Sequence, residues 1–222
     1  MLKLGEKGAI PQKDKETYAI APHIPCGVVT PQLLRNLADV AEKYNVQAMK
    51  ITGATRIAMI GFKEEQIDAA WQDLGMQPGA AVGLCVRSIR ACPGNTYCKI
   101  GKQDALGMGM RLDKAYHGVN LPNKLKMAVS GCHLNCAESW VRDIGLVGKP
   151  EGWMLTIGGN VGPIPRIGRE LVTGLDDDQA IEAIAKIVAY YEREANKGER
   201  LGKMLERVGM EPFEKVVEFT SA

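Results

Sequence analysis

The sequence predicts an α+β protein built from two successive parts. The first third of the chain alternates short apolar runs, typical of strands, with amphipathic stretches, typical of helices. The middle contains paired cysteines among closely spaced glycines, and the last quarter has the apolar periodicity of a helix. With 222 residues, of which 45% are hydrophobic and 24% charged, the chain can bury a substantial core.

The first part follows from local patterns. Thr30 suits a helix N-cap and Pro31 the first helical position, and apolar residues then recur at helical spacing. Gly75 ends a second helix. In chain order, the predicted elements are a strand near 24–29, a helix over 31–44, strands over 46–52 and 55–61, and a helix from about 63 to 74. This β-α-β-β-α order predicts a ferredoxin-like unit.

A turn-rich stretch, residues 75–79, separates this unit from the second part. We therefore predict domains over 1–79 and 80–222. In the second domain, residues 126–130 and 153–157 are predicted strands that enter glycine-containing loops. Three aspartates at 176–178 mark the start of a long helix that is complete before Gly198, and we expect this C-terminal part to be packing scaffold.

Charge is unevenly distributed along the chain. The net charge is only +2, which argues against a nucleic-acid-binding protein. Residues 84–170, however, hold 12 Lys and Arg against 6 Asp and Glu, so the middle of the chain is cationic and needs an anionic partner. The sequence has no apolar run long enough to span a membrane and no recognisable signal peptide, so we expect a cytoplasmic protein without membrane contact.

Four cysteines form two closely spaced pairs. Cys92 and Cys98 enclose five residues, and Cys132 and Cys136 enclose three. Four thiolates on two loops are the ligand count of a 4Fe-4S cluster. Structural zinc is the alternative, but zinc ribbons normally use pairs separated by two residues, so the spacing favours iron and sulfur. The remaining cysteines, Cys26 and Cys85, stand singly in apolar surroundings and are expected to be buried thiols.

Segments around these pairs resemble the sirohaem and 4Fe-4S module of sulfite and nitrite reductases. The resemblance is carried by residues 87–98, RSIRACPGNTYC, and residues 121–137, LPNKLKMAVSGCHLNCA, and it extends from about Arg87 to Arg169. The preceding unit resembles the ferredoxin-like half-domain of the same family. The resemblance implies that all four paired cysteines bind the cluster and that Cys136 also bridges to the sirohaem iron.

The cationic middle of the chain is explained by the same resemblance, because sirohaem carries carboxylates and the substrates are oxyanions. By motif position, the substrate cations are Arg56, Arg87, Lys124 and Lys126. The last two are two residues apart, so on a strand they would point the same way. The candidates for contacts to sirohaem carboxylates are Lys99, Lys102, Arg142, Arg166 and Arg169. For each cation the simpler alternative is an ordinary solvated surface charge.

The resemblance implies six-electron reduction of sulfite to sulfide, with an external donor such as ferredoxin because no flavin or nicotinamide motif is present. Reduction of nitrite to ammonia is the alternative within the family, and a non-catalytic electron-transfer or sirohaem-binding protein is the alternative outside it. Larger family members contain two copies of this unit, whereas this chain has one. We therefore predict a homo-oligomer in which two chains share sites.

Overall fold

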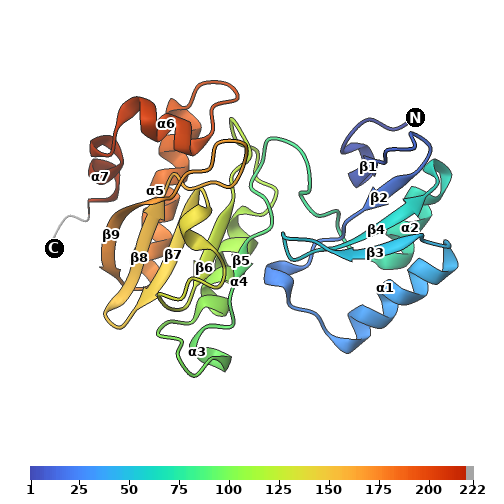
Figure 1. The fold of residues 1–222 in the computed structure, drawn as a ribbon, viewed down its shortest axis with the longest axis horizontal. Helices are drawn as coiled ribbons and strands as arrows, with labels where there is room; N and C mark the ends of the chain where they lie inside the picture. Colours follow the sequence, from blue (N-terminus) through green and yellow to red (C-terminus); the bar gives the residue numbers. More distant parts are fainter. Residues whose placement is uncertain (219–222) are drawn as a thin grey trace. The chain divides into compact units, whose positions relative to one another are not determined.

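The chain consists of two compact units, Met1–Gly83 and Leu84–Ala222, in a computed structural model that describes residues 1–218 (Figure 1). Each unit has a hydrophobic core of its own. Both combine helices with a sheet, which confirms the predicted α+β class.

The first unit is a four-stranded antiparallel sheet with two helices. The sheet order is β1-β2-β4-β3. Side chains from α1, α2, β2 and β4 form the core, with Leu37, Met59, Phe62 and Ile67 fully buried. The elements are β1 (Ala9–Pro11), β2 (Tyr18–Ile20), α1 (Pro31–Lys43), β3 (Ala48–Ile51), β4 (Ile57–Phe62) and α2 (Ile67–Leu74).

Helix signals in this unit were predicted correctly. The Thr30 hydroxyl accepts a hydrogen bond from the Leu33 N–H at 3.1 Å, as an N-cap does. Gly75 ends α2 in the left-handed conformation with φ 61°. The strand predicted near residues 24–29 is wrong, because Pro25–Gly27 forms a 3₁₀ turn in which Cys26 and Gly27 both have positive φ. Strands β1 and β2 were not predicted, and each is only three residues long.

The second unit is a five-stranded mixed sheet in the order β5-β6-β7-β8-β9. The first three strands are parallel, and β8 and β9 continue the sheet antiparallel. Residues from α4, α5, α6 and α7 pack into the core with the strands. The elements are β5 (Arg90–Ala91), α3 (Gly94–Tyr97), α4 (Ala105–Tyr116), β6 (Met127–Ser130), β7 (Ile144–Lys149), β8 (Gly152–Ile157), β9 (Arg169–Leu175), α5 (Asp177–Glu194), α6 (Leu201–Val208) and α7 (Glu211–Val217).

Predicted elements of the second unit occur close to their expected positions. The strand expected at 126–130 is β6, and the strand expected at 153–157 is β8. The Asp176 carboxylate caps α5 by accepting from the Gln179 N–H at 2.8 Å. Because β6 begins at Met127, Lys126 lies one residue before the strand in which it was expected.

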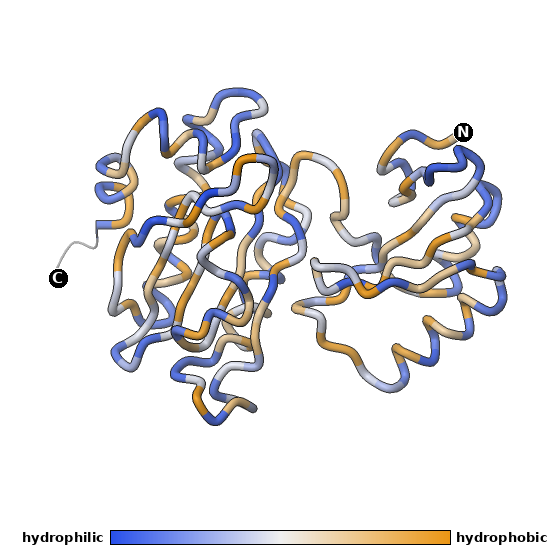
Figure 2. Tube along the Cα trace, in the orientation of Figure 1, coloured by the Kyte–Doolittle hydropathy of each residue, from blue (hydrophilic) through white to orange (hydrophobic). Residues whose placement is uncertain are grey.

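Hydropathy varies sharply along the helices. In Figure 2, α1 alternates between hydrophilic and hydrophobic residues, as expected of a helix with one face on the core. Within residues 1–218, no helix is both long and apolar enough to cross a membrane.

Candidate functional site

The two cysteine pairs follow two neighbouring parallel strands. Cys92 comes directly after β5, and Cys132 lies two residues after β6. These strands pair in parallel with Ala91 opposite Val129, so both end at the same edge of the sheet. The Cys92 N–H donates to the Val129 carbonyl at 3.1 Å. The sheet therefore brings together loops that lie about forty residues apart in the sequence.

Close backbone contact joins the two cysteine loops. A Cβ atom on Gly131 would lie 2.8 Å from the Gly94 Cα and 2.9 Å from the Gln103 carbonyl oxygen. The Gly131 carbonyl accepts from the N–H groups of Lys102 and Gln103 at 2.7 and 3.1 Å. Only glycine fits at position 131 without moving backbone, so this residue fixes the separation of the loops.

All four paired cysteines line one small pocket of about 80 Å³. Cys132 is buried, Cys92 and Cys98 are half-buried, and Cys136 is exposed. The Gly131 N–H donates to the Cys92 Sγ at 3.0 Å, and hydrogen bonds of this kind stabilise cluster thiolates. Four sulfur donors around one cavity fit a 4Fe-4S cluster. Among residues 1–218, no group of three or more His, Cys, Asp or Glu side chains is arranged to hold a single metal ion.

Three of the predicted substrate cations lie on two adjacent segments. Leu125, between Lys124 and Lys126, pairs in parallel with Val86, and the Arg87 N–H donates to the Leu125 carbonyl at 2.9 Å. Leu125 is fully buried, whereas Lys124 is exposed and Lys126 half-buried. The alternation places both lysines on the side opposite to Leu125 even though they are outside β6.

Burial and neighbouring charges shift the pKa of two of these cations, Lys126 and Arg87. Burial lowers the pKa of Lys126, and the positive charges of Arg142, Arg200 and Lys124 lower it further, whereas Asp143 raises it. Burial likewise lowers the pKa of Arg87. Lys126 is therefore a cation in a positively charged, partly desolvated environment, which favours binding of an anion.

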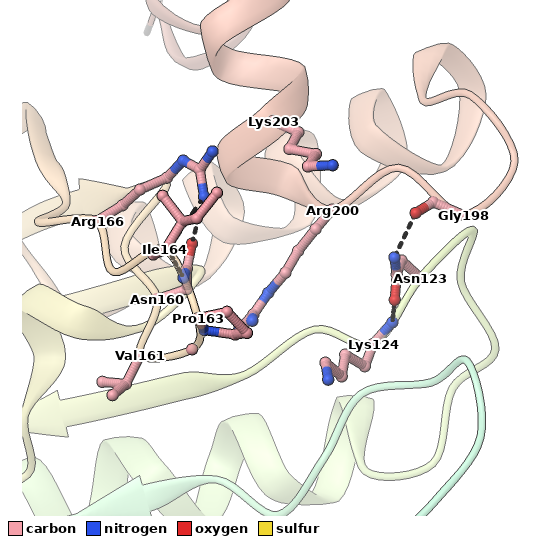
Figure 3. Close-up of a pocket in the computed structure, with 11 residues that line it drawn as sticks. Asn123, Lys124, Asn160, Val161, Pro163, Ile164, Arg166, Gly198, Arg200 and Lys203 are labelled. Carbon is pink, nitrogen blue, oxygen red and sulfur yellow. Dashed lines mark hydrogen bonds between the residues drawn. The ribbon is translucent and has the colours of Figure 1, made fainter.

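A second pocket, of about 350 Å³, is lined by four cations (Figure 3). Lys124 and Arg166 were predicted as functional residues, whereas Arg200 and Lys203 were not. The Asn160–Ile164 loop forms another wall, and Asn123 donates to the Gly198 carbonyl beside it. Glu206 binds the Arg166 guanidinium through both carboxylate oxygens at 2.6 and 2.9 Å, which neutralises part of the charge. We call this cavity the cationic pocket.

The other predicted sirohaem contacts are dispersed over the second unit. Lys99 and Lys102 are exposed beside the cysteine pocket, and Arg169 is exposed at the start of β9. Arg142 is only 7% exposed and binds Glu138 at 2.6 Å. Its Nε is buried without a hydrogen-bond partner within residues 1–218, so a carboxylate acceptor would satisfy it.

Arg56, the fourth predicted substrate cation, belongs to the first unit. It directly precedes β4 and is 8% exposed. A Cβ on Gly79 would lie 2.9 Å from the Arg56 Cδ, so the chain passes closely over this side chain. Its role as a substrate cation stays a prediction.

Sequence reasoning missed residues whose position depends on tertiary packing. Arg200 and Lys203 follow the long C-terminal helix, which was expected to be scaffold only. Asp143 is fully buried between Arg142 and the apolar strand β7, and it binds Arg200. Asp143 could have been noticed in the sequence, because it is a charged residue directly before an apolar run. Arg200 and Lys203 had none, because surface cations are common.

Two family models match the chain. The model described as the nitrite and sulphite reductase 4Fe-4S domain matches residues 82–221, and the nitrite/sulfite reductase ferredoxin-like half domain matches residues 10–77. Solved structures of similar fold include dissimilatory sulfite reductase I, with a TM-score of 0.82 and 15% identity over 93% of this chain and 70% of that one. The Mycobacterium tuberculosis NirA protein has a TM-score of 0.78 and 19% identity, over 90% of this chain and 39% of that one.

Named relatives include both sulfite and nitrite reductases. An assimilatory-type sulfite reductase of Nitratidesulfovibrio vulgaris is 43% identical over 95% of this chain and 97% of its own length. A nitrite reductase [NAD(P)H] of Bacillus subtilis is 40% identical over 93% of this chain, which spans only 26% of that longer protein. On the family models and these identities, the chain belongs to the nitrite and sulfite reductase family.

Proposed function

We propose that the chain catalyses the six-electron reduction of sulfite to sulfide. The observation that carries this proposal is the co-occurrence of a four-cysteine pocket and a cationic pocket in one unit. The match to an assimilatory-type sulfite reductase over nearly the whole of both chains supports sulfite as the substrate. Membership of the family makes the chain an oxidoreductase and implies a 4Fe-4S cluster and a sirohaem.

For the cofactors, we propose that Cys92, Cys98, Cys132 and Cys136 hold the cluster and that Cys136, the most exposed of them, also links it to the sirohaem iron. When bound, these groups deliver electrons singly to the substrate. The residues that we propose to bind sirohaem carboxylates are Lys99, Lys102, Arg142, Arg166 and Arg169. The buried Nε of Arg142 supports its assignment.

For the substrate, we propose that Arg56, Arg87, Lys124 and Lys126 bind the oxyanion. The adjacent backbones of Arg87 and Leu125 support joint action of the last three. Their positive charge stabilises the anion, and protonated lysines supply protons as oxygen atoms leave as water. The lowered pKa of Lys126 suits this role, because a proton held less tightly is transferred more readily.

We further propose domain assignments of 1–79 for the ferredoxin-like half-domain and 80–222 for the cofactor domain. The electron donor is proposed to be a small carrier such as ferredoxin. A reducing cytoplasm suits a chain with six free cysteines.

A homo-oligomer with shared sites is proposed because the chain holds one copy of the unit. Mixing Cys136→Ser subunits with Lys124→Ala subunits tests it. If sites are shared, the mixture recovers activity that neither variant has alone, and no recovery contradicts sharing.

Nitrite reduction is the second candidate, favoured by 40% identity to the Bacillus subtilis nitrite reductase. Anaerobically purified protein is assayed with a reduced low-potential dye and either sulfite or nitrite, after its visible spectrum has been recorded. Sirohaem bands with faster sulfite turnover support the proposal. Faster turnover of nitrite than of sulfite supports nitrite reduction instead. A brown, haem-free, inactive sample indicates a non-catalytic iron–sulfur protein.

A further inference from the structure

One buried carboxylate connects three segments of the cationic pocket. Asp143 is fully buried at the entrance of β7. Its side chain accepts the Lys126 N–H at 2.8 Å, and its backbone carbonyl accepts the Gly158 N–H at 2.8 Å. Lys126 is the last residue of the segment that carries Lys124. Gly158 precedes the Asn160–Ile164 loop, which forms another wall of the pocket. Asp143 itself does not line the pocket.

The third segment is held through Arg200. Its Nε donates to the Asp143 Oδ1 at 2.7 Å and its Nη2 to the Oδ2 at 2.8 Å, which is the bidentate geometry of a strong charge-assisted pair. The Arg200 side chain is 15% exposed and lines the pocket. Its Nη1 has no hydrogen-bond partner within residues 1–218, so the guanidinium retains donors for an anion.

The direction of Arg200 follows from this pair. Figure 3 shows the side chain extending from the start of α6 toward the Asn160–Ile164 loop, with Lys124 on the opposing segment and Lys203 on α6. A guanidinium bound through two nitrogens has one remaining orientation, whereas a lone arginine samples many rotamers. Burial raises the pKa of the Asp143 carboxyl, and Arg200 and Lys126 oppose this rise. In its ionised form the carboxylate reduces the mutual repulsion of Lys126, Arg142 and Arg200.

We propose that Asp143 is the positioning residue of the cationic pocket, and that it holds Arg200 and the Lys124–Lys126 segment so that they bind the substrate oxyanion together. The proposal rests on the proposed function and adds two residues to it. Asp143 touches no substrate. Its effect passes through Arg200, which contacts the anion, and through the backbone of Lys126.

Two variants and a matched control test the proposal on the cofactor-loaded protein. Asp143→Asn preserves the size of the side chain but removes its charge. Arg200→Gln leaves Asp143 in place and alters a partly exposed side chain, so it remains informative if Asp143→Asn fails to fold. The control is Glu199→Gln, because Glu199 forms the same bidentate pair with Arg207 at 2.8 and 2.7 Å and neither residue lines the cationic pocket.

The measurements are sulfite affinity by calorimetry on the oxidised protein, and KM and kcat for sulfite at matched cofactor absorbance. We expect Asp143→Asn and Arg200→Gln to raise both Kd and KM about tenfold or more, as loss of a residue that orients a ligand does, with a smaller change in kcat. Glu199→Gln should leave Kd and KM within about twofold of the original protein.

A Kd unchanged in both Asp143→Asn and Arg200→Gln overturns the proposal, as does an equal rise in Glu199→Gln, which would indicate a general structural effect. If the unaltered protein neither binds nor reduces sulfite, the proposed function fails and this inference fails with it. If the unaltered protein binds and reduces sulfite while the two variants behave like it, only the inference fails.

Discussion

The two pockets of the second unit are assembled in different ways. The cysteine pocket is formed by two loops that directly follow neighbouring parallel strands, and each loop contributes two cysteines within a few residues. The cationic pocket takes Lys124 from the segment before β6, Arg166 from a loop before β9, and Arg200 and Lys203 from the end of the chain. One pocket depends on local motifs, and the other depends on how distant segments pack.

This difference determines which substitutions each pocket tolerates. In the cysteine pocket, close backbone contacts at Gly131 fix the separation of the two cysteine loops. In the cationic pocket, charge-assisted hydrogen bonds to Asp143 and Glu206 fix the arginines. We therefore expect the cysteine pocket to fail through steric substitutions and the cationic pocket to fail through loss of charge.

The largest effect is expected from Gly131→Ala. The added methyl group would lie within 3 Å of backbone atoms of Gly94 and Gln103, so the cysteine loops must separate. We expect loss of the cluster absorbance and of nearly all activity. Gly162→Ala is the control from the cationic pocket, because the atom nearest to the added methyl group there is the Asn160 Nδ2, at 3.7 Å. A normal spectrum and normal turnover in Gly131→Ala would contradict the steric account.

An intermediate effect is expected from pH acting on the cationic pocket region. The pKa of Lys126 is lowered, so this lysine loses its proton at a pH below the usual lysine pKa of about 10.4. Once it is neutral, Lys126 no longer attracts the sulfite anion. KM for sulfite should therefore rise on the alkaline side before ordinary lysines titrate. Lys126→Arg should move this rise to higher pH, since arginine stays protonated.

The matched control for this pH profile is Lys114→Arg, which alters an exposed lysine on α4. Its profile should equal that of the unaltered protein. Identical profiles for Lys126→Arg and the unaltered protein would exclude Lys126 as the titrating group.

The smallest effect is expected at Glu199, in the connection that carries Arg200. Hydrogen bonds from Arg207, and from the Asn196 N–H, lower the pKa of Glu199 to about 2. A lowered carboxyl pKa contributes stability that is present above the unfolded pKa of about 4.3 and is lost as pH falls toward 2. Glu199→Gln should reduce the free energy of unfolding at neutral pH by about 1 kcal/mol, after allowance for solvent screening.

Urea unfolding at pH 7 and pH 3 measures this contribution. The difference between the original protein and Glu199→Gln should shrink at the lower pH. Glu211→Gln is the control, because its pair with Lys215 is largely exposed and should contribute nothing measurable. A constant difference at both pH values would show that the Glu199 charge is not its source.

Elements set by interactions between near neighbours in the sequence were predictable, whereas elements that depend on other interactions were not. Thr30, Gly75 and Asp176 act within a few residues of the chain, and their helix boundaries were predicted correctly. The strand expected near Ile24 was wrong, because Pro25 and Gly27 turn the backbone despite apolar neighbours. Strands β1 and β2 were missed, because three residues are too few to show a period.

The sequence by itself determined the family and its two cysteine pairs, because these cysteines lie on short loops with characteristic spacing. It also placed Arg87 shortly before the first cysteine pair, and Lys124 and Lys126 shortly before the second. Only the tertiary structure showed that Arg200 and Lys203 join Lys124 and Arg166 around one cavity. The burial of Asp143 in its pair with Arg200 was likewise a result of packing. Coulomb attraction and hydrogen bonding act through space, so side chains far apart in the sequence combine only after the sheet and helices have brought them together.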